Sequence, residues 1–113
     1  MVGSGRKKRE VRIPMRLPVR VWGMDLNGKL FDIKAYTIDI TPVSARLAGF
    51  WESFYRGMNI GIECGGRRAR FRVAWVGESN TEHAGEIGVQ SVERGRYIWG
   101  VPLKRHAYTE DVA

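Results

Sequence analysis

The chain has 113 residues, 43% of them hydrophobic, and a formal net charge of +7. This length supports one domain with one core, and the composition is that of a globular protein rather than a disordered chain. No apolar run is long enough to span a membrane and none follows the first charges, so we expect neither a transmembrane helix nor a secretory signal.

The basic charge is concentrated at the N-terminus. Residues 1 to 20 contain seven arginines or lysines and one acid, whereas the other 93 residues contain 12 bases and 11 acids. Residues 1 to 11 have the composition of a flexible arm. An arm this basic favours an anionic partner such as a phosphate ligand, a nucleic acid or an acidic lipid surface. The alternative is a solvated tail that only aids solubility.

Strand character begins near Val19, and the alternation that follows directs Trp22 outward. The Asn-Gly pair at 27–28 predicts a tight hairpin turn, and residues 29–40 form the returning strand. The inward apolar positions of this strand change phase near Tyr36, which predicts a bulge. Small barrels bend in this way at their corners.

The returning strand runs into DITPVS, a turn that carries Asp39, Thr41 and Ser44, and then into a short strand with Arg46 directed outward. Four aromatic residues follow: Phe50, Trp51, Phe54 and Tyr55. Their spacing is helical, but the segment is too short for more than a turn or two, so we expect it to close one end of the core.

Three further strands are predicted in the second half of the chain. Residues 58–64 alternate cleanly and place the single cysteine, Cys64, in the core, which suits a reducing compartment and a cytoplasmic protein. Residues 86–92 form the last strand. Residues 68–77 form the clearest one, with an arginine stripe outward and four apolar residues inward: Ala69, Phe71, Val73 and Trp75.

About six strands joined by short turns indicate an all-β fold. Closure into a small six-stranded antiparallel β-barrel hides the strand edges. We assign residues 1–11 to the arm, 12–105 to the barrel domain and 106–113 to a frayed C-terminal tail.

Catalysis and metal binding are not expected. His83 and His106 lie far apart in the sequence, and no metal-ligand spacing, phosphate loop or nucleophile motif is present. The outward arginine stripe at 68, 70 and 72 lacks aromatic residues on its own face of the strand. It therefore reads as a solvated surface, and a generic nucleic-acid-binding barrel is the weakest of the functions considered.

Two motifs together give the sequence a family resemblance. A basic segment, KKREVR, precedes the first strand, and DITPVS follows the second. With the later segments RFRVAWVG and GEIGVQSV, the chain resembles the PilZ family of small bacterial β-barrels from about residue 6 to residue 100. That family carries an RxxxR motif and a DxSxxG motif, which map onto Lys8 and Arg12, and onto Asp39, Thr41 and Ser44.

The resemblance implies a receptor for the bacterial second messenger cyclic di-GMP, with no other cofactor. Arginine can grip a phosphate or lie flat on a guanine, the aspartate accepts from guanine or braces an arginine, and the hydroxyl donates to phosphate or ties down the turn. Ligand binding would order the arm on the barrel and present a surface to a partner protein, either as a monomer or as a ligand-dependent dimer. The implied ligand-binding residues are Lys8, Arg9, Arg12, Asp39, Thr41, Ser44 and Arg46.

The sequence departs from the family motifs at three positions. Lys8 replaces an arginine and loses its planar fork, and Thr41 replaces a serine but keeps the hydroxyl. Ser44 replaces a glycine, which costs on the order of 1 kcal/mol if the backbone there is left-handed. These changes weaken binding by about one to three decades. The alternative is a nucleotide-independent protein adaptor with an exposed apolar patch around Phe50, Trp51 and Tyr55.

Overall fold

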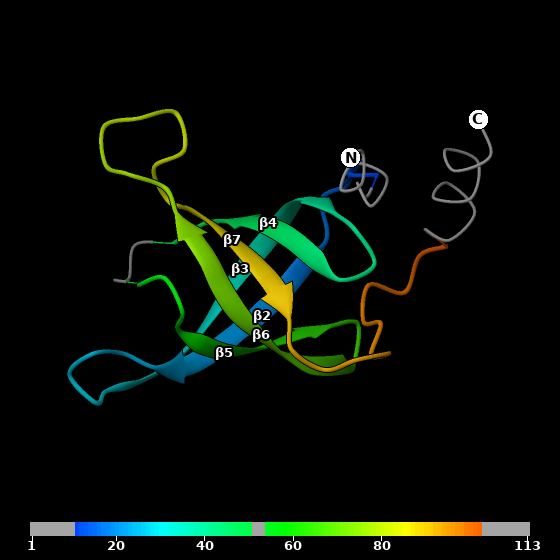
Figure 1. Cartoon of the computed structure of the whole chain (residues 1–113), viewed down its shortest axis with the longest axis horizontal. Helices are drawn as coiled ribbons and strands as arrows, with labels where there is room; N and C mark the ends of the chain where they lie inside the picture. Colours follow the sequence, from blue (N-terminus) through cyan, green and yellow to red (C-terminus); the bar gives the residue numbers. More distant parts are fainter. Residues whose placement is uncertain (1–10, 51–53, 103–113) are drawn as a thin grey trace, which may run out of the picture.

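The computed structural model describes residues 11–50 and 54–102 of the chain. These residues form seven strands and contain no helix (Figure 1). The strands are β1 (Ile13–Pro14), β2 (Pro18–Met24), β3 (Leu30–Ile40), β4 (Ser44–Ala48), β5 (Asn59–Cys64), β6 (Arg67–Val76) and β7 (Glu86–Ser91).

The strands close into a six-stranded antiparallel barrel, which confirms the predicted fold. Their order around the sheet is β3, β2, β5, β6, β7 and β4, and pairing of β3 with β4 completes the circle (Figure 1). The short β1 pairs with the far end of β3 as an extra strand. Apart from Val11, the predicted arm lies outside the described residues, as does the predicted tail at 106–113. No helix that could cross a membrane occurs in the part of the chain described.

The core fills the barrel with alternate residues of every strand. Val21 and Ile62 are fully buried, and Cys64 is 5% exposed, as predicted. Burial raises the pKa of the Cys64 thiol, and the charge of Arg67 partly opposes the shift. Outside two bulges in β3 and β6, the alternation acts as expected and places the core residues on one side of the strands.

Aromatic residues close one end of this core. Phe50 is 5% exposed, and its ring centroid lies 4.8 Å from that of Phe54. Phe54 in turn contacts Phe31 at 5.4 Å. Phe50 therefore belongs to the core and Phe54 packs against it, which agrees with the prediction for two of the four aromatic residues. The prediction of an exposed apolar patch that includes Phe50 is wrong, because the Phe50 side chain is buried in the core. Of the other two residues of the predicted patch, Tyr55 is exposed and Trp51 lies outside the described residues.

The predicted hairpin turn joins β2 to β3 and is fixed by one carboxylate. Oδ1 of Asp25 accepts hydrogen bonds from the amides of Asn27 and Lys29, each at 2.9 Å. Gly28 has a φ of 80°, the left-handed conformation that such a turn requires. Local sequence therefore accounts for the conformation of this turn.

A bulge in β3 directs Asp39 to the outside of the barrel. Thr37 pairs with the inward Leu47, whereas Asp39 pairs with the outward Arg46, so Ile38 is the extra residue. Residues opposite each other in an antiparallel pair share a face, and the bulge therefore reverses the alternation. The predicted bulge is present, but it lies at Ile38 rather than near Tyr36.

A second bulge, in β6, has the same effect on Trp75. Val73 pairs with the inward Val89, but Trp75 pairs with Gly88, so Ala74 is the extra residue. Gly88 lies between the inward residues of β7 and faces outward, and Trp75 therefore faces outward too. The prediction that Trp75 continues the inward set is wrong, because strict alternation does not survive a bulge.

Candidate functional site

The two bulges create one row of residues across the outer face of four adjacent strands. Asp39 on β3 pairs with Arg46 on β4, which pairs with Gly88 on β7, which pairs with Trp75 on β6. We call these four residues the outer row. Without the bulge in β3, Asp39 would point into the core, and without the bulge in β6, Trp75 would do so. The outer row therefore depends on both bulges.

The indole of Trp75 lies directly over Gly88. An ideal Cβ built on Gly88 would stand 2.1 Å from Nε1 of Trp75, far inside contact distance. Glycine within a strand commonly marks such a close approach. The ring of His83 meets the same indole edge to face, with centroids 6.1 Å apart. Trp75 is thus a fixed aromatic surface beside the charged end of the row.

Asp39 holds two arginines at that charged end. Its Oδ1 accepts from Nη1 of Arg12 at 3.1 Å, and its Oδ2 accepts from Nη2 of Arg46 at 2.9 Å. Nη1 of Arg46 lies 3.8 Å from Glu86, whose Oε1 is also 3.0 Å from Nδ1 of His83. Nε of Arg46 is buried and has no acceptor among the described residues, so the guanidinium keeps one unsatisfied donor.

These side chains surround a surface hollow of about 440 Å³, a size usual for small-molecule sites. Its lining comprises Arg12, Asp39, Arg46, Trp75 and His83. Asp39 lies between the two guanidinium groups of the lining, and Glu86, just outside the lining, also lies 3.8 Å from Arg46. Arg12 also lies just after the basic N-terminal segment, which is therefore joined to the barrel at this hollow.

Thr41 and Ser44 form the turn that leads into Arg46. Oγ1 of Thr41 accepts from the amides of Val43 and Ser44 at 3.2 and 3.0 Å, and it lies 2.7 Å from Oγ of Ser44. Thr41 is only 2% exposed, and its carbonyl accepts from Nε1 of Trp99 at 2.9 Å. In this conformation the Thr41 hydroxyl stabilises the turn, which is one of the two roles that the family resemblance implied, the other being donation to a phosphate.

The backbone at Ser44 is not left-handed. Asn80 is the one non-glycine residue with a positive φ in the described part of the chain. The strain expected at Ser44 for a missing glycine therefore does not arise. What remains at this position is the volume of a hydroxymethyl group, which Thr41 holds toward the turn.

Of the seven predicted site residues, the structure brings Arg12, Asp39 and Arg46 into direct contact and places Thr41 and Ser44 on the adjoining turn. Lys8 and Arg9 lie outside the described residues. Sequence reasoning missed Trp75, whose alternation pattern pointed inward. Gly88 was the available signal, because a glycine inside an apolar strand indicates that something bulky lies against it.

A second tryptophan lies over a glycine elsewhere on the barrel. Trp22 of β2 pairs with Gly61 of β5, and a Cβ on Gly61 would stand 2.3 Å from the indole. The guanidinium carbon of Arg68 is 5.9 Å from the centre of this ring. A smaller hollow of about 240 Å³ borders the pair, lined by Arg20, Trp22, Asp32, Glu63 and Arg68.

No family model matches the sequence, and no curated protein matches it. The described residues also contain no group of three or more His, Cys, Asp or Glu side chains that could hold a metal ion. The geometry of the outer row and the sequence motifs are therefore the features that point to a function.

Proposed function

We propose that this barrel is a PilZ-type receptor for cyclic di-GMP, in which the outer row and the basic arm bind the dinucleotide together. The observation that carries the proposal is the outer row, because it joins a carboxylate-braced arginine pair to an aromatic surface within one hollow. A ligand with two phosphates and two purines requires both kinds of group. The proposed protein is a bacterial cytoplasmic receptor rather than an enzyme.

The phosphates are assigned to Arg12 and Arg46. A guanidinium group binds phosphate through two parallel hydrogen bonds. Each of these arginines donates only one hydrogen bond to Asp39, so its other N–H groups can bind a phosphate. Asp39 fixes both forks on the same side of the barrel, so less conformational entropy is lost when the ligand binds. The unsatisfied Nε of Arg46 gains an acceptor if the side chain turns toward a phosphate.

A guanine is assigned to the face of Trp75. Stacking of a base on an aromatic side chain contributes about 1–3 kcal/mol, and the contact over Gly88 holds the indole in place for it. Lys8 and Arg9 complete the proposed site from the arm, four and three residues before Arg12. Closure of the arm over the ligand would transmit binding to a partner protein.

Calorimetry with cyclic di-GMP at moderate salt tests the proposal. Arg46→Ala should weaken binding by roughly tenfold to a hundredfold, because it removes a charge-assisted phosphate contact. Arg20→Ala is the matched control, since Arg20 also pairs with two acids but lies beside Trp22, and it should leave the affinity within about twofold. No binding heat from the unaltered chain at high micromolar ligand would refute the receptor.

The departures from the family motifs permit a gain-of-binding test. Lys8→Arg combined with Ser44→Gly restores the planar fork and removes the hydroxymethyl group, so the double variant should bind cyclic di-GMP more tightly by about tenfold. Calorimetry compares it with each single variant. An unchanged affinity would show that the two motifs were mapped to the wrong residues.

A protein adaptor remains the second candidate, supported by a different surface from the one expected. Met24, Leu26 and Leu30 at the tip of the β2–β3 hairpin are 53%, 74% and 72% exposed. Clustered apolar side chains on a rigid turn are typical of protein contacts. Replacing all three with Ser should abolish partner capture without changing nucleotide binding if the adaptor function is correct.

A further inference from the structure

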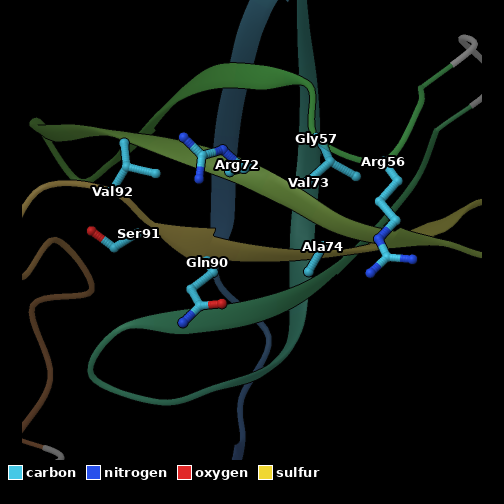
Figure 2. Close-up of a pocket in the computed structure, with 8 residues that line it drawn as sticks. All are labelled: Arg56, Gly57, Arg72, Val73, Ala74, Gln90, Ser91 and Val92. Carbon is cyan, nitrogen blue, oxygen red and sulfur yellow. The ribbon is translucent and has the colours of Figure 1, made fainter.

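A groove of about 620 Å³ lies on the outer face of β6 and β7, with arginines along it. Figure 2 shows Arg56 and Ala74 at one side, Ser91 and Val92 at the other, and Arg72 with Gln90 between them. Arg72 and Gln90 are paired across the two strands. The groove therefore has a fixed floor of paired backbone and exposed cationic side chains above it.

The groove belongs to a larger basic surface. Arg68, Arg70 and Arg72 recur at every second residue of β6, a spacing of about 6.6 Å along the strand. The loop after β7 packs beside them, since Nε of Arg96 donates to the carbonyl of Arg68 at 2.9 Å. We call this surface the arginine face; its exposed members are Arg56, Arg68, Arg70, Arg72 and Arg96.

Folding concentrates positive charge on this face, because the sequence after the first 20 residues is nearly neutral as a whole. The acids on the arginine face are Glu93, 3.7 Å from Arg70, and Glu63, which pairs with Arg20. Arg56 and Arg72 form no ion pair within the described residues. Several other acids of the barrel, Glu78, Glu82 and Glu86, lie in or beside the loop between β6 and β7.

We propose that the arginine face, centred on the groove between Arg56 and Arg72, docks an extended acidic segment of a partner protein. Carboxylates at alternate positions of an extended chain repeat at the same interval of about 6.6 Å as the arginines of β6. Each arginine fork can accept a carboxylate in bidentate geometry. The proposal does not depend on cyclic di-GMP binding.

Two features favour a polypeptide over a nucleic acid. None of the residues that line the groove is aromatic, so bases would find no stacking surface within it, and the indole of Trp22, which adjoins the arginine face, already has Arg68 over its ring. Glu63 and Glu93 interrupt the positive field and would repel a uniformly charged phosphate backbone. A protein segment can match such a mixed pattern by placing its own bases opposite the two glutamates.

The test uses the full chain and a fluorescent peptide of alternating Glu and Thr, with a Gln–Thr peptide as the neutral probe. Anisotropy should show saturable binding of the acidic peptide only. Arg56→Glu with Arg72→Glu should weaken it by roughly tenfold or more. Lys29→Glu with Lys34→Glu makes the same change in net charge on the β2–β3 hairpin and should have a much smaller effect.

Amide NMR shifts locate the contact. The peptide should perturb Arg72, Gln90 and Ser91. Perturbation of Arg12 and Arg46 alone, with full binding by the Arg56/Arg72 variant, would assign the peptide to the basic arm and overturn the proposal. Tighter binding of duplex DNA with the same dependence on Arg56 and Arg72 would make this a nucleic-acid surface instead, and equal losses in both charge-reversal variants would show non-specific attraction.

Discussion

The barrel contains the same local arrangement twice, a tryptophan lying over a glycine of the neighbouring strand, but in different electrostatic surroundings. Around Trp22 two arginines and two acids line a hollow of about 240 Å³. Around Trp75 two arginines and one acid line a hollow of about 440 Å³, and a second acid, Glu86, pairs with Arg46 from outside the lining. The packing is equivalent, so the volume of the hollow and the arrangement of its charged groups distinguish a candidate binding site from an ordinary surface.

The side chains that contact the two indole rings also differ. Arg68 lies over Trp22, so the protein already supplies a cation to that ring. Trp75 instead meets His83 edge to face and borders a hollow in which one carboxylate, Asp39, holds two arginines. Comparison of the two tryptophans therefore separates what the fold requires from what ligand binding requires, and variants at matched positions can test this separation.

The largest expected effect comes from adding a methyl group beneath each ring. Neither Gly88 nor Gly61 has a left-handed φ, so alanine is acceptable to the backbone, but its Cβ must displace the indole. Both Gly88→Ala and Gly61→Ala should lower the free energy of unfolding by about 1–3 kcal/mol in urea titrations. Only Gly88→Ala should also weaken cyclic di-GMP binding, by roughly tenfold.

The double variant Gly88→Ala with Trp75→Ala supplies the control for displacement. If the loss of stability in Gly88→Ala comes from collision with the indole, the two changes together should cost less than their sum. Additive losses would show that Gly88 is required for another reason. Equal effects of Gly88→Ala and Gly61→Ala on ligand affinity would contradict the functional difference between the two regions.

An intermediate effect is expected at the turns that adjoin the two regions. Thr41→Val removes a nearly buried hydroxyl and leaves the amides of Val43 and Ser44 without their acceptor, so it should lower the free energy of unfolding by about 2 kcal/mol. Asp25→Ala removes the corresponding acceptor from an exposed turn, where water can replace it, and should cost about 1 kcal/mol or less. Chemical denaturation measures both, and a larger loss at Asp25 would contradict the burial argument.

The difference between the two regions also explains how much could be predicted from the sequence. The β2–β3 hairpin follows strict alternation and has an Asn-Gly turn, so its strands and the outward Trp22 were predictable from local rules. The closed barrel was predictable as well, because six short strands must hide their edges. Asp39 was found through its motif and Arg46 as an outward residue of the next strand, although sequence alone gave two roles for Asp39 and could not choose between them.

Trp75 could not be placed in this way, because its orientation depends on a pairing between distant segments. The bulge at Ala74 is evident only from the pairing of β6 with β7. The local sequence RFRVAWVG alternates regularly and gives no sign of it. The bulge at Ile38 was predictable from the change of phase in β3. The predicted position was two residues too early, because Thr37 is polar and was not counted among the inward residues, although it is fully buried. Non-local register therefore limits prediction at the residues that matter most for the proposed site.

The smallest expected effect concerns the titration of Asp32, beside Trp22. The pKa of Asp32 lies below its ordinary value, mainly because Arg20 donates hydrogen bonds to it; desolvation opposes this shift and the charge of Arg20 adds to it. A lowered pKa in the folded state adds stability above the pKa of the unfolded chain, and that stability is lost as the pH falls through the folded value. Arg20→Ala should therefore move the pKa of Asp32 upward and remove this pH dependence.

Carboxyl NMR titration of the unaltered chain and of Arg20→Ala measures the change directly, with Arg46→Ala as the matched variant at the other tryptophan. Arg46→Ala should leave Asp32 unchanged, since the two arginines pair with different acids. A shift of Asp32 in Arg46→Ala would mean that the two regions are electrostatically coupled through the barrel. Independent titration instead means that the Trp75 hollow can be altered by a ligand while the charge network around Trp22 stays as it is.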